Sequence, residues 1–182
     1  LVVALKVIKL TERDFRNIVR EISFLNKLRS KYIVGIYDLF YLEDEVYIVL
    51  EYAQNGDLYE KIIKEGPFNE NKTKHIMVDI CKAIKKCHDQ GIIHSDIKPE
   101  NILIVGEKIK LADFGLSFKD DKKVKSIGGT IDYTAPEVLT GAITTGSFKC
   151  IDIWSIGVLL YELVTGVLPF QDETDEITIQ RI

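Results

Sequence analysis

A run of polar residues lies between two strongly apolar runs near the middle of the chain, where residues 92–104 read IIHSDIKPENILI. Within this run Asp96 could accept a proton, Lys98 could neutralise anionic oxygen, and Asn101 could ligate a hard cation through its side-chain carbonyl. Polar loops beside strands are common sites of catalysis. A well-capped turn without chemistry is the alternative interpretation.

A second candidate, Asp113, directly follows a run typical of a buried strand and precedes Phe114 and Gly115. A carboxylate at the end of a strand, beside a glycine that frees the backbone, suits a metal-binding position. This three-residue motif is too short to be specific by itself.

Two charged residues stand in apolar surroundings in the first part of the chain. Glu21 lies about 60° from Ile18 and about 40° from Leu25 around a helix, so it points into the apolar face. Lys6 is equally out of place in an apolar strand. Breaking a buried ion pair typically costs about 3–5 kcal/mol, so we expect the two residues to pair. Alternatively, Glu21 reaches out to solvent and Lys6 lies on the solvent side of an edge strand.

The elements that position these residues follow from the apolar periodicity. Apolar runs predict strands over residues 1–8, 34–42, 46–52, 102–105 and 108–111. Helical periodicity predicts helices over residues 11–29, 57–64, 70–90 and 150–165, with Asn69 as the N-cap of the third. The last helix is apolar nearly all round, which predicts full burial. Strands give way to helices near residues 53–56, where we place a domain boundary.

The composition is that of an ordinary globular domain, with 182 residues, 46% hydrophobic and 29% charged. A net charge of −4 gives no support to nucleic-acid binding. The long apolar run near the C-terminus is too short to span a bilayer, so we expect no membrane partner. The three cysteines have no metal or redox spacing, which favours an intracellular and cytoplasmic protein.

Taken in order, these segments resemble a eukaryotic-type serine/threonine protein kinase domain. The motifs are Val3-Ala4-Leu5-Lys6, Glu21, the loop from His94 to Asn101, Asp113-Phe114-Gly115, Ala135-Pro136-Glu137 and Asp152-Ile153-Trp154-Ser155-Ile156-Gly157. The resemblance covers all 182 residues and implies an α+β, two-lobed fold. Residues 1–53 would be part of the small β-rich lobe, and residues 54–182 part of the helical lobe.

The resemblance implies ATP and Mg²⁺ as cofactors and protein serine or threonine as substrate. Lys6 would hold the α- and β-phosphates and pair with Glu21. Asp96 would orient the substrate hydroxyl, and Lys98 would stabilise the transferring phosphoryl group. The metal ligands would be Asn101 and Asp113.

Further roles carry over in the same way. Ala4 and Leu103 would contact the two faces of the adenine ring, and Leu50 would be the gatekeeper. The backbone from Glu51 to Ala53 would contact adenine, and Asp57 would lie near the ribose. Structural roles fall on His94 and Phe114, which would stack with Leu25 and Ile36, and on Gly115, Glu137 and Asp152. Asp152 would anchor the backbone of the catalytic loop. His75 and His88 are expected on helix surfaces without a special role.

The segment before Ala135 supports the serine/threonine class, since the resemblance implies that Thr130 bridges Asp96 and Lys98. A simple loop threonine is the alternative. The sequence departs from the family at Ser95, where an arginine usually pairs with a phosphate on the activation segment. Ser126 aligns with the common phosphosite, although an unmodified serine is the alternative. We therefore expect activity to depend less on phosphorylation of this segment than in arginine-bearing kinases.

Three acidic residues bear on which protein substrates would be preferred. Asp57, Glu100 and Glu162 match positions that favour arginine upstream of the target residue. Alternatively, each is a solvated carboxylate, or Glu162 joins an ion pair on its helix face. A pseudokinase scaffold on the same fold is the main rival function, and a small-molecule kinase is a weaker one.

The sequence has no Gly-x-Gly-x-x-Gly run before Lys6, and residues 171–182 resemble only the start of a helix. We therefore expect a domain cut at both ends, without the usual arginine partner of Glu137. Exposed faces of the helix over residues 150–165 should make such a piece prone to association. We also expect it to bind ATP weakly and to transfer phosphate poorly.

Overall fold

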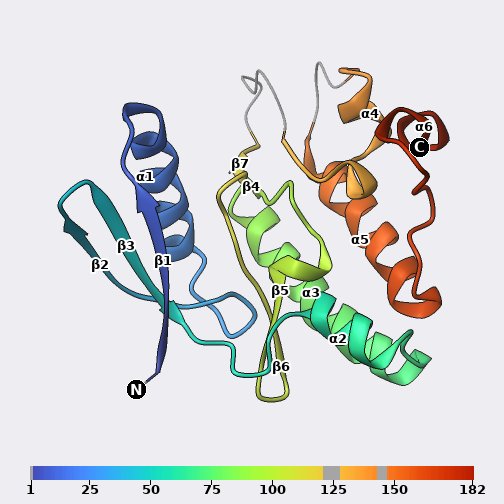
Figure 1. Cartoon of the computed structure of the whole chain (residues 1–182), viewed down its shortest axis with the longest axis horizontal. Coiled ribbons are helices and arrows are strands. Elements are labelled where there is room, and N and C mark those ends of the chain that lie inside the picture. Colours follow the sequence, from blue (N-terminus) through green and yellow to red (C-terminus); the bar gives the residue numbers. More distant parts are fainter. Residues whose placement is uncertain (1, 121–127, 143–146) are drawn as a thin grey trace.

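The computed structural model describes residues 2–120, 128–142 and 147–182. Its N-terminal part is a three-stranded antiparallel sheet in the order β1-β3-β2, formed by β1 (Val3–Lys9), β2 (Ile36–Leu42) and β3 (Glu45–Glu51). Helix α1 (Glu12–Lys27) packs beside this sheet (Figure 1). The predicted elements are present here, with ends shifted by one or two residues.

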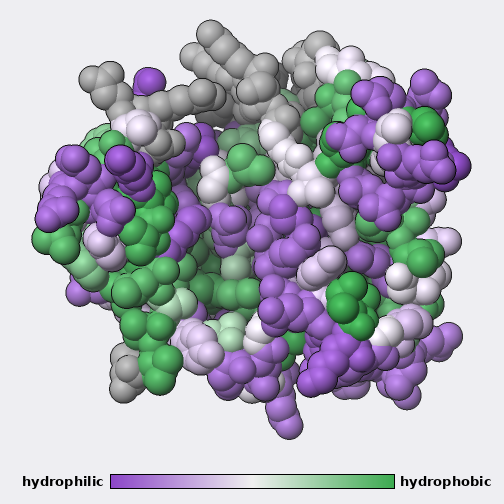
Figure 2. All heavy atoms as spheres, viewed as in Figure 1, coloured by the Kyte–Doolittle hydropathy of each residue, from purple (hydrophilic) through white to green (hydrophobic). Residues whose placement is uncertain are grey.

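The alternation of side chains in β1 decides which residues face the interior. Ala4, Lys6 and Ile8 are partly buried, whereas Leu5 and Val7 on the other face are exposed. In Figure 2 hydrophobic side chains gather over the sheet around β1. Lys6 is paired in register with Ile48, which is fully buried. The strand therefore directs Lys6 toward α1 rather than toward solvent.

The rest of the chain is mainly helical. Its helices are α2 (Leu58–Glu65), α3 (Glu70–Asp89), α4 (Pro136–Leu139), α5 (Lys149–Thr165) and α6 (Asp175–Arg181). Short strands form two antiparallel pairs, β4 (Ile92–Ile93) with β7 (Phe118–Lys119) and β5 (Ile102–Val105) with β6 (Lys108–Leu111). The side chain of Asn69 accepts a hydrogen bond from Lys72 N, so the predicted N-cap of α3 is confirmed.

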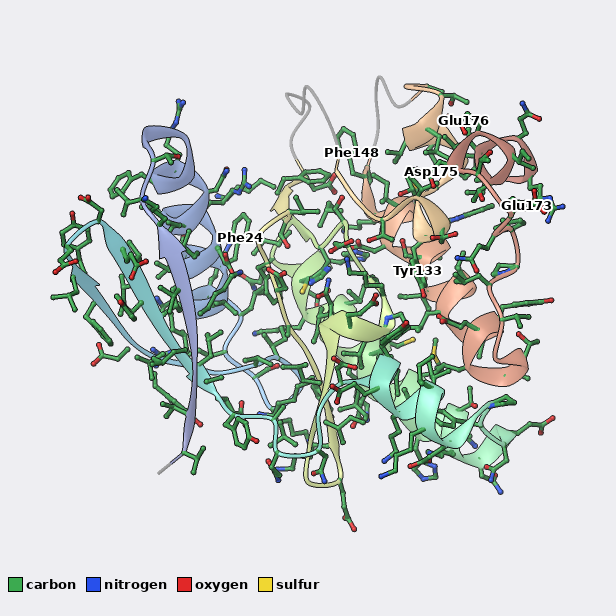
Figure 3. All side chains as sticks on the ribbon, viewed as in Figure 1. Phe24, Tyr133, Phe148, Glu173, Asp175 and Glu176 are labelled. Carbon is green, nitrogen blue, oxygen red and sulfur yellow. The ribbon has the colours of Figure 1, made fainter. Side chains whose placement is uncertain are left out.

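One hydrophobic core joins the sheet part to the helical part. Phe24 and Leu25 of α1, and Leu28 directly after it, belong to the same buried cluster as residues of α3, β5 and β6 and as Phe114. Figure 3 shows Phe24 pointing from α1 toward the helical part. The fold is a mixed α+β structure, and the division of the chain near residues 53–56 stays a prediction.

The prediction that the helix over residues 150–165 is fully buried is wrong for one face. Helix α5 buries Ile151, Val158 and Leu159, but Ile153 is 58% exposed and Val164 is 46% exposed. An all-apolar pattern carries no information on which face is covered, because no polar stripe marks the solvent side. Among the described helices, none has the length and apolar character needed to cross a membrane.

Candidate active site

Lys6 lies between two carboxylates that come from distant parts of the chain. Its Nζ is 2.7 Å from Glu21 Oε1 and 3.0 Å from Asp113 Oδ1. Glu21 is only 4% exposed. The structure thus contains the expected ion pair, and neither Lys6 nor Glu21 adopts the solvent-facing alternative.

The charges of this group shift the pKa values of Lys6 and Asp113. Burial disfavours the charged form of Lys6, but Glu21 and Asp113 outweigh burial and raise its pKa. Burial also acts against the Asp113 carboxylate, yet Lys6 and the Gly115 amide lower its pKa overall. Lys6 and Asp113 are therefore held in their charged forms around neutral pH.

The backbone after Asp113 is closely packed. Asp113 has a positive φ of 57°, and Gly115 N donates to Asp113 Oδ1 at 3.2 Å. A Cβ atom at Gly115 would meet that same oxygen at 3.2 Å, so the position favours glycine. Arg20 Nη2 of α1 donates to the Gly115 carbonyl at 3.1 Å, which fixes the helix that carries Glu21 to this turn.

Asp96, Lys98 and Asn101 converge in the loop between β4 and β5. Lys98 Nζ lies 3.0 Å from Asp96 Oδ2, and Asn101 Nδ2 donates to the same oxygen at 2.9 Å. Asn101 Nδ2 also donates to the Asp96 carbonyl at 2.7 Å. Because the amide nitrogen is used in this way, the Asn101 side-chain oxygen is the atom that could meet a cation.

Thr130 contacts both Asp96 and Lys98. Lys98 Nζ donates to Thr130 Oγ1 at 2.8 Å, and Thr130 Oγ1 donates to Asp96 Oδ1 at 3.1 Å. The bridge implied by the resemblance is therefore present, and the alternative of a simple loop threonine does not fit. Ser126 lies outside the described residues.

Two residues of the site, Asn101 and Asp113, carry side-chain oxygens that are suitable ligands for Mg²⁺. In the described part of the chain no group of three or more His, Cys, Asp or Glu side chains forms a self-contained metal site. Mg²⁺ commonly binds to one or two carboxylates together with substrate phosphates and water. A set of one amide oxygen and one carboxylate fits that manner of binding.

Asp152 of α5 is fully buried and accepts hydrogen bonds from the loop between β4 and β5. Its Oδ2 accepts from His94 N at 3.0 Å, and its Oδ1 accepts from Ser95 N at 2.8 Å. The expectation that His88 has no special role is wrong, because His88 Nε2 lies 2.7 Å from Asp152 Oδ2. The spacing could have placed His88 on the buried side of α3, since it follows the buried Ile84 by one helical turn, but it could not have identified Asp152 as the partner.

The expected hydrophobic stack is also assembled. His94 and Phe114 are fully buried, with their rings edge to face at 4.9 Å. Leu25 lies in the same core as Phe114, and Ile36 packs against that core. His94 Nε2 lies 3.0 Å from the Ala112 carbonyl. His75 is exposed, and its Nδ1 lies 2.7 Å from the Asn71 carbonyl of the same helix.

A cavity of about 230 Å³ opens beside Lys6, between the sheet and the helical part. Its lining includes the expected residues Ala4, Lys6, Glu21, Leu50, Glu51, Asn101, Leu103 and Asp113. Ala53 and Asp57 are not among the lining residues. Asp57 instead caps α2, since its carboxylate accepts from Glu60 N at 2.8 Å.

An ion pair that the sequence did not predict lies at the edge of this cavity. Lys110 Nζ of β6 lies 2.8 Å from the Glu51 carboxylate, and Gly35 N donates to Glu51 Oε2 at 3.0 Å. Lys110 is only 9% exposed. The strand reads KIKL, so its lysines alternate with apolar residues and both would be expected on the solvent side, which is why the sequence carries no signal for this pair.

Glu162 of α5 is buried beside the segment that contains Thr130. Tyr133 donates its hydroxyl hydrogen to Glu162 Oε2 at 2.5 Å, so a helix-face ion pair is not its role in the structure. Figure 3 shows Tyr133 next to α5. Burial raises the pKa of Glu162, Tyr133 opposes this, and the negative charges of Glu100 and Asp132 raise it further.

Glu137 of α4 lies at a second, mainly apolar cavity. This cavity has a volume of about 650 Å³ and is lined by Cys150, Trp154, Tyr161 and Phe170 among others. Trp154 and Phe170 stack with ring centroids 5.7 Å apart. Burial and Glu137 raise the pKa of the Cys150 thiol.

Comparison with known proteins matches residues 1–182 to the family model of the protein kinase domain. The serine/threonine protein kinase OSK3 of Oryza sativa is 37% identical over 94% of this chain and 35% of its own length. The Aurora kinase of Candida glabrata is 38% identical, over 92% of this chain and 47% of its own. The human NUAK family SNF1-like kinase 1 is 37% identical, over 94% and 26%. The chain thus spans less than half of the length of these relatives.

Proposed function

Because the chain belongs to the protein kinase domain family, we propose that it transfers the γ-phosphate of ATP to serine or threonine hydroxyls of protein substrates. The observation that carries this proposal is that Lys6, Glu21, Asn101 and Asp113 line one cavity, with Asp96 hydrogen-bonded to Asn101. The names of the relatives, which are serine/threonine kinases, support the residue class of the substrate.

Each side chain has a part that its geometry allows. Lys6, fixed by Glu21, would bind phosphate oxygens in the cavity. Asp96 would accept a hydrogen bond from the substrate hydroxyl and orient it, and Lys98 would compensate charge on the phosphoryl oxygens. Mg²⁺, held through Asn101 and Asp113, would supply further charge neutralisation. Positioning and electrostatics of this kind account for most of the catalysis in phosphoryl transfer.

The nucleotide-binding roles belong to the same proposal. Ala4, Leu50 and Leu103 line the cavity with apolar surface that suits an adenine ring. The backbone from Glu51 to Ala53 would offer it hydrogen bonds. The Glu51 side chain is engaged by Lys110, so only its main chain is left for the base. Asp57 remains a candidate for the ribose.

A transfer assay with radiolabelled ATP on the full-length protein tests the proposal, beside an Asp113→Asn variant. We expect label on serine or threonine of a protein substrate, and its loss in the variant. Binding of ATP without any transfer would instead indicate the pseudokinase alternative. Transfer to a small molecule alone would indicate a small-molecule kinase.

We further propose that substrates carry basic residues upstream of the target. Glu162 already lies among the negative charges of Glu100 and Asp132, which raise its pKa, so a cation brought to this place would relieve repulsion. A peptide array that shows no preference for arginine or lysine would remove this proposal. The intracellular location and the role of Ser126 stay predictions. Loss of all activity in a full-length Ser126→Ala protein would contradict the expectation that activity depends less on phosphorylation than in arginine-bearing kinases.

A further inference from the structure

Ser95 connects the catalytic loop to the segment that carries Thr130. Its Oγ donates a hydrogen bond to the Gly128 carbonyl at 2.9 Å, while its backbone N donates to Asp152 Oδ1 at 2.8 Å. The residue is only 5% exposed. Through its hydroxyl and its backbone N–H, this one residue thus joins the loop, the segment and helix α5.

The backbone of the segment at Gly129 also lies close to the backbone carbonyl of Ser95. A Cβ atom at Gly129 would lie 3.0 Å from the Ser95 carbonyl and 3.2 Å from Thr134 Oγ1. A side chain at residue 129 would therefore push the segment away from the loop. Thr134 Oγ1 also donates to the Thr130 carbonyl at 2.8 Å, which fixes the segment on its far side.

Fixing Gly128 also fixes Thr130, because only Gly129 lies between them. The Thr130 hydroxyl in turn contacts Lys98 at 2.8 Å and Asp96 at 3.1 Å. The hydrogen bond from Ser95 thus lies at the start of a short path that ends on the proposed catalytic residues.

We propose that Ser95 is a positioning residue, whose hydroxyl holds the Gly128–Thr130 backbone so that Thr130 aligns Asp96 and Lys98 for a protein substrate. The contact is a hydrogen bond between uncharged groups, so it needs no phosphate on the segment. This inference rests on the proposed function, because it concerns the same site.

The backbone of Ser95 decides which variants test the idea. Its φ is 69°, in the left-handed region that glycine and asparagine adopt most readily. Ser95→Gly keeps this conformation without strain and removes the hydroxyl. Ser95→Asn also tolerates it and supplies an amide N–H₂ that can donate to the Gly128 carbonyl. Thr73→Val is the control, since it removes a buried hydroxyl from α3, outside the loop and the segment, and this hydroxyl has no hydrogen-bond partner among the described residues.

Two measurements on the full-length protein decide the outcome. In Ser95→Gly we expect hydrogen exchange of the amides of residues 128–134 to quicken about two- to tenfold, the range for one uncharged hydrogen bond. The kcat/KM for a peptide substrate should fall by a similar factor, while the KM for ATP stays the same. Ser95→Asn should restore much of both, and Thr73→Val should change neither.

Unchanged exchange and unchanged peptide kinetics in Ser95→Gly would overturn the inference. So would an equal defect in Ser95→Asn, or a loss of ATP affinity as large as the loss for peptide. If the wild-type protein transfers no phosphate, the proposed function fails, and with it the catalytic purpose given to Ser95. The exchange measurement would still show whether the hydroxyl holds the segment, so the two failures are distinguishable.

Discussion

Lys6 shows at the residue scale how a buried charge is made stable. Its two carboxylate partners, Glu21 and Asp113, are 15 and 107 residues away in the sequence. Only Glu21 is deeply buried, since the Lys6 and Asp113 side chains are 34% and 49% exposed. The cost of losing the lysine therefore falls mainly on Glu21.

We expect Lys6→Met to lower the free energy of unfolding by about 1–3 kcal/mol, because Glu21 is left buried without its cation. This lies below the usual cost for a fully buried pair because Lys6 is partly exposed. Urea unfolding measures the change. Lys9→Met, at an exposed lysine of the same strand, is the matched control and should be nearly neutral. Equal effects of the two variants would contradict the expectation.

Glu162 gives a prediction on pH dependence. Its pKa is raised in the folded protein by burial, against the opposing effect of Tyr133, so the folded state holds a proton more readily than the unfolded chain. Stability should therefore fall as the pH rises from about 4.5 through the raised pKa. Glu162→Gln removes this titration. The melting temperature of Glu162→Gln minus that of the wild type should increase as the pH rises over that window. A difference that stays constant with pH would contradict the raised pKa of Glu162.

At the scale of elements, Asp152 connects α3, α5 and the catalytic loop. His88 approaches it from α3, while the amides of His94 and Ser95 approach it from the loop. A carboxylate that is completely buried is stable only when its oxygens are well satisfied. His88 therefore supports the loop through Asp152, although it does not touch the cavity beside Lys6.

We expect His88→Ala to destabilise the protein by about 1–3 kcal/mol, the cost of leaving a buried acceptor short of one partner. Amide exchange at His94 and Ser95 should quicken, and thermal unfolding should occur earlier. His75→Ala removes an exposed histidine from the same helix and serves as the control. If both variants behave alike, the contact with Asp152 contributes little.

At the scale of the whole molecule, apolar side chains remain exposed on several surfaces, two of which involve β1 and α5. One is the outer face of β1, with Leu5 and Val7, and the other is the outer face of α5, with Ile153 and Val164. The cavity of about 650 Å³ extends the second surface. Extended apolar patches of this kind promote association with other molecules.

A protein made of residues 1–182 should therefore self-associate at micromolar concentrations and bind a hydrophobic dye. The double variant Ile153→Lys and Val164→Lys should weaken both, because it places two charges on the exposed face of α5. Sedimentation velocity and dye fluorescence provide the measurements. A matched pair of changes at exposed lysines, Lys9→Gln and Lys108→Gln, should leave association unchanged. A wild-type chain that sediments as a monomer would contradict this prediction.

Most elements and much of the candidate site follow from the sequence alone. Apolar periodicity placed the strands and helices to within a few residues, because side-chain direction repeats every 2 or about 3.6 residues. The pairing of Lys6 with Glu21 could be inferred because each is a charge in apolar surroundings. That rule does not apply to Lys110, which alternates with apolar residues in its strand and whose partner Glu51 lies 59 residues away.

Only the tertiary structure decided which distant groups meet and which faces are covered. His88 has an ordinary position on α3, and nothing nearby in the sequence indicates Asp152, 64 residues later. Helix α5 is apolar on all sides, so its sequence could not tell the packed face from the exposed one. The hydrogen bond from Ser95 to Gly128 needs a positive φ and a close approach of two loops. Local periodicity is encoded by neighbours along the chain, whereas these contacts depend on packing between segments far apart in sequence.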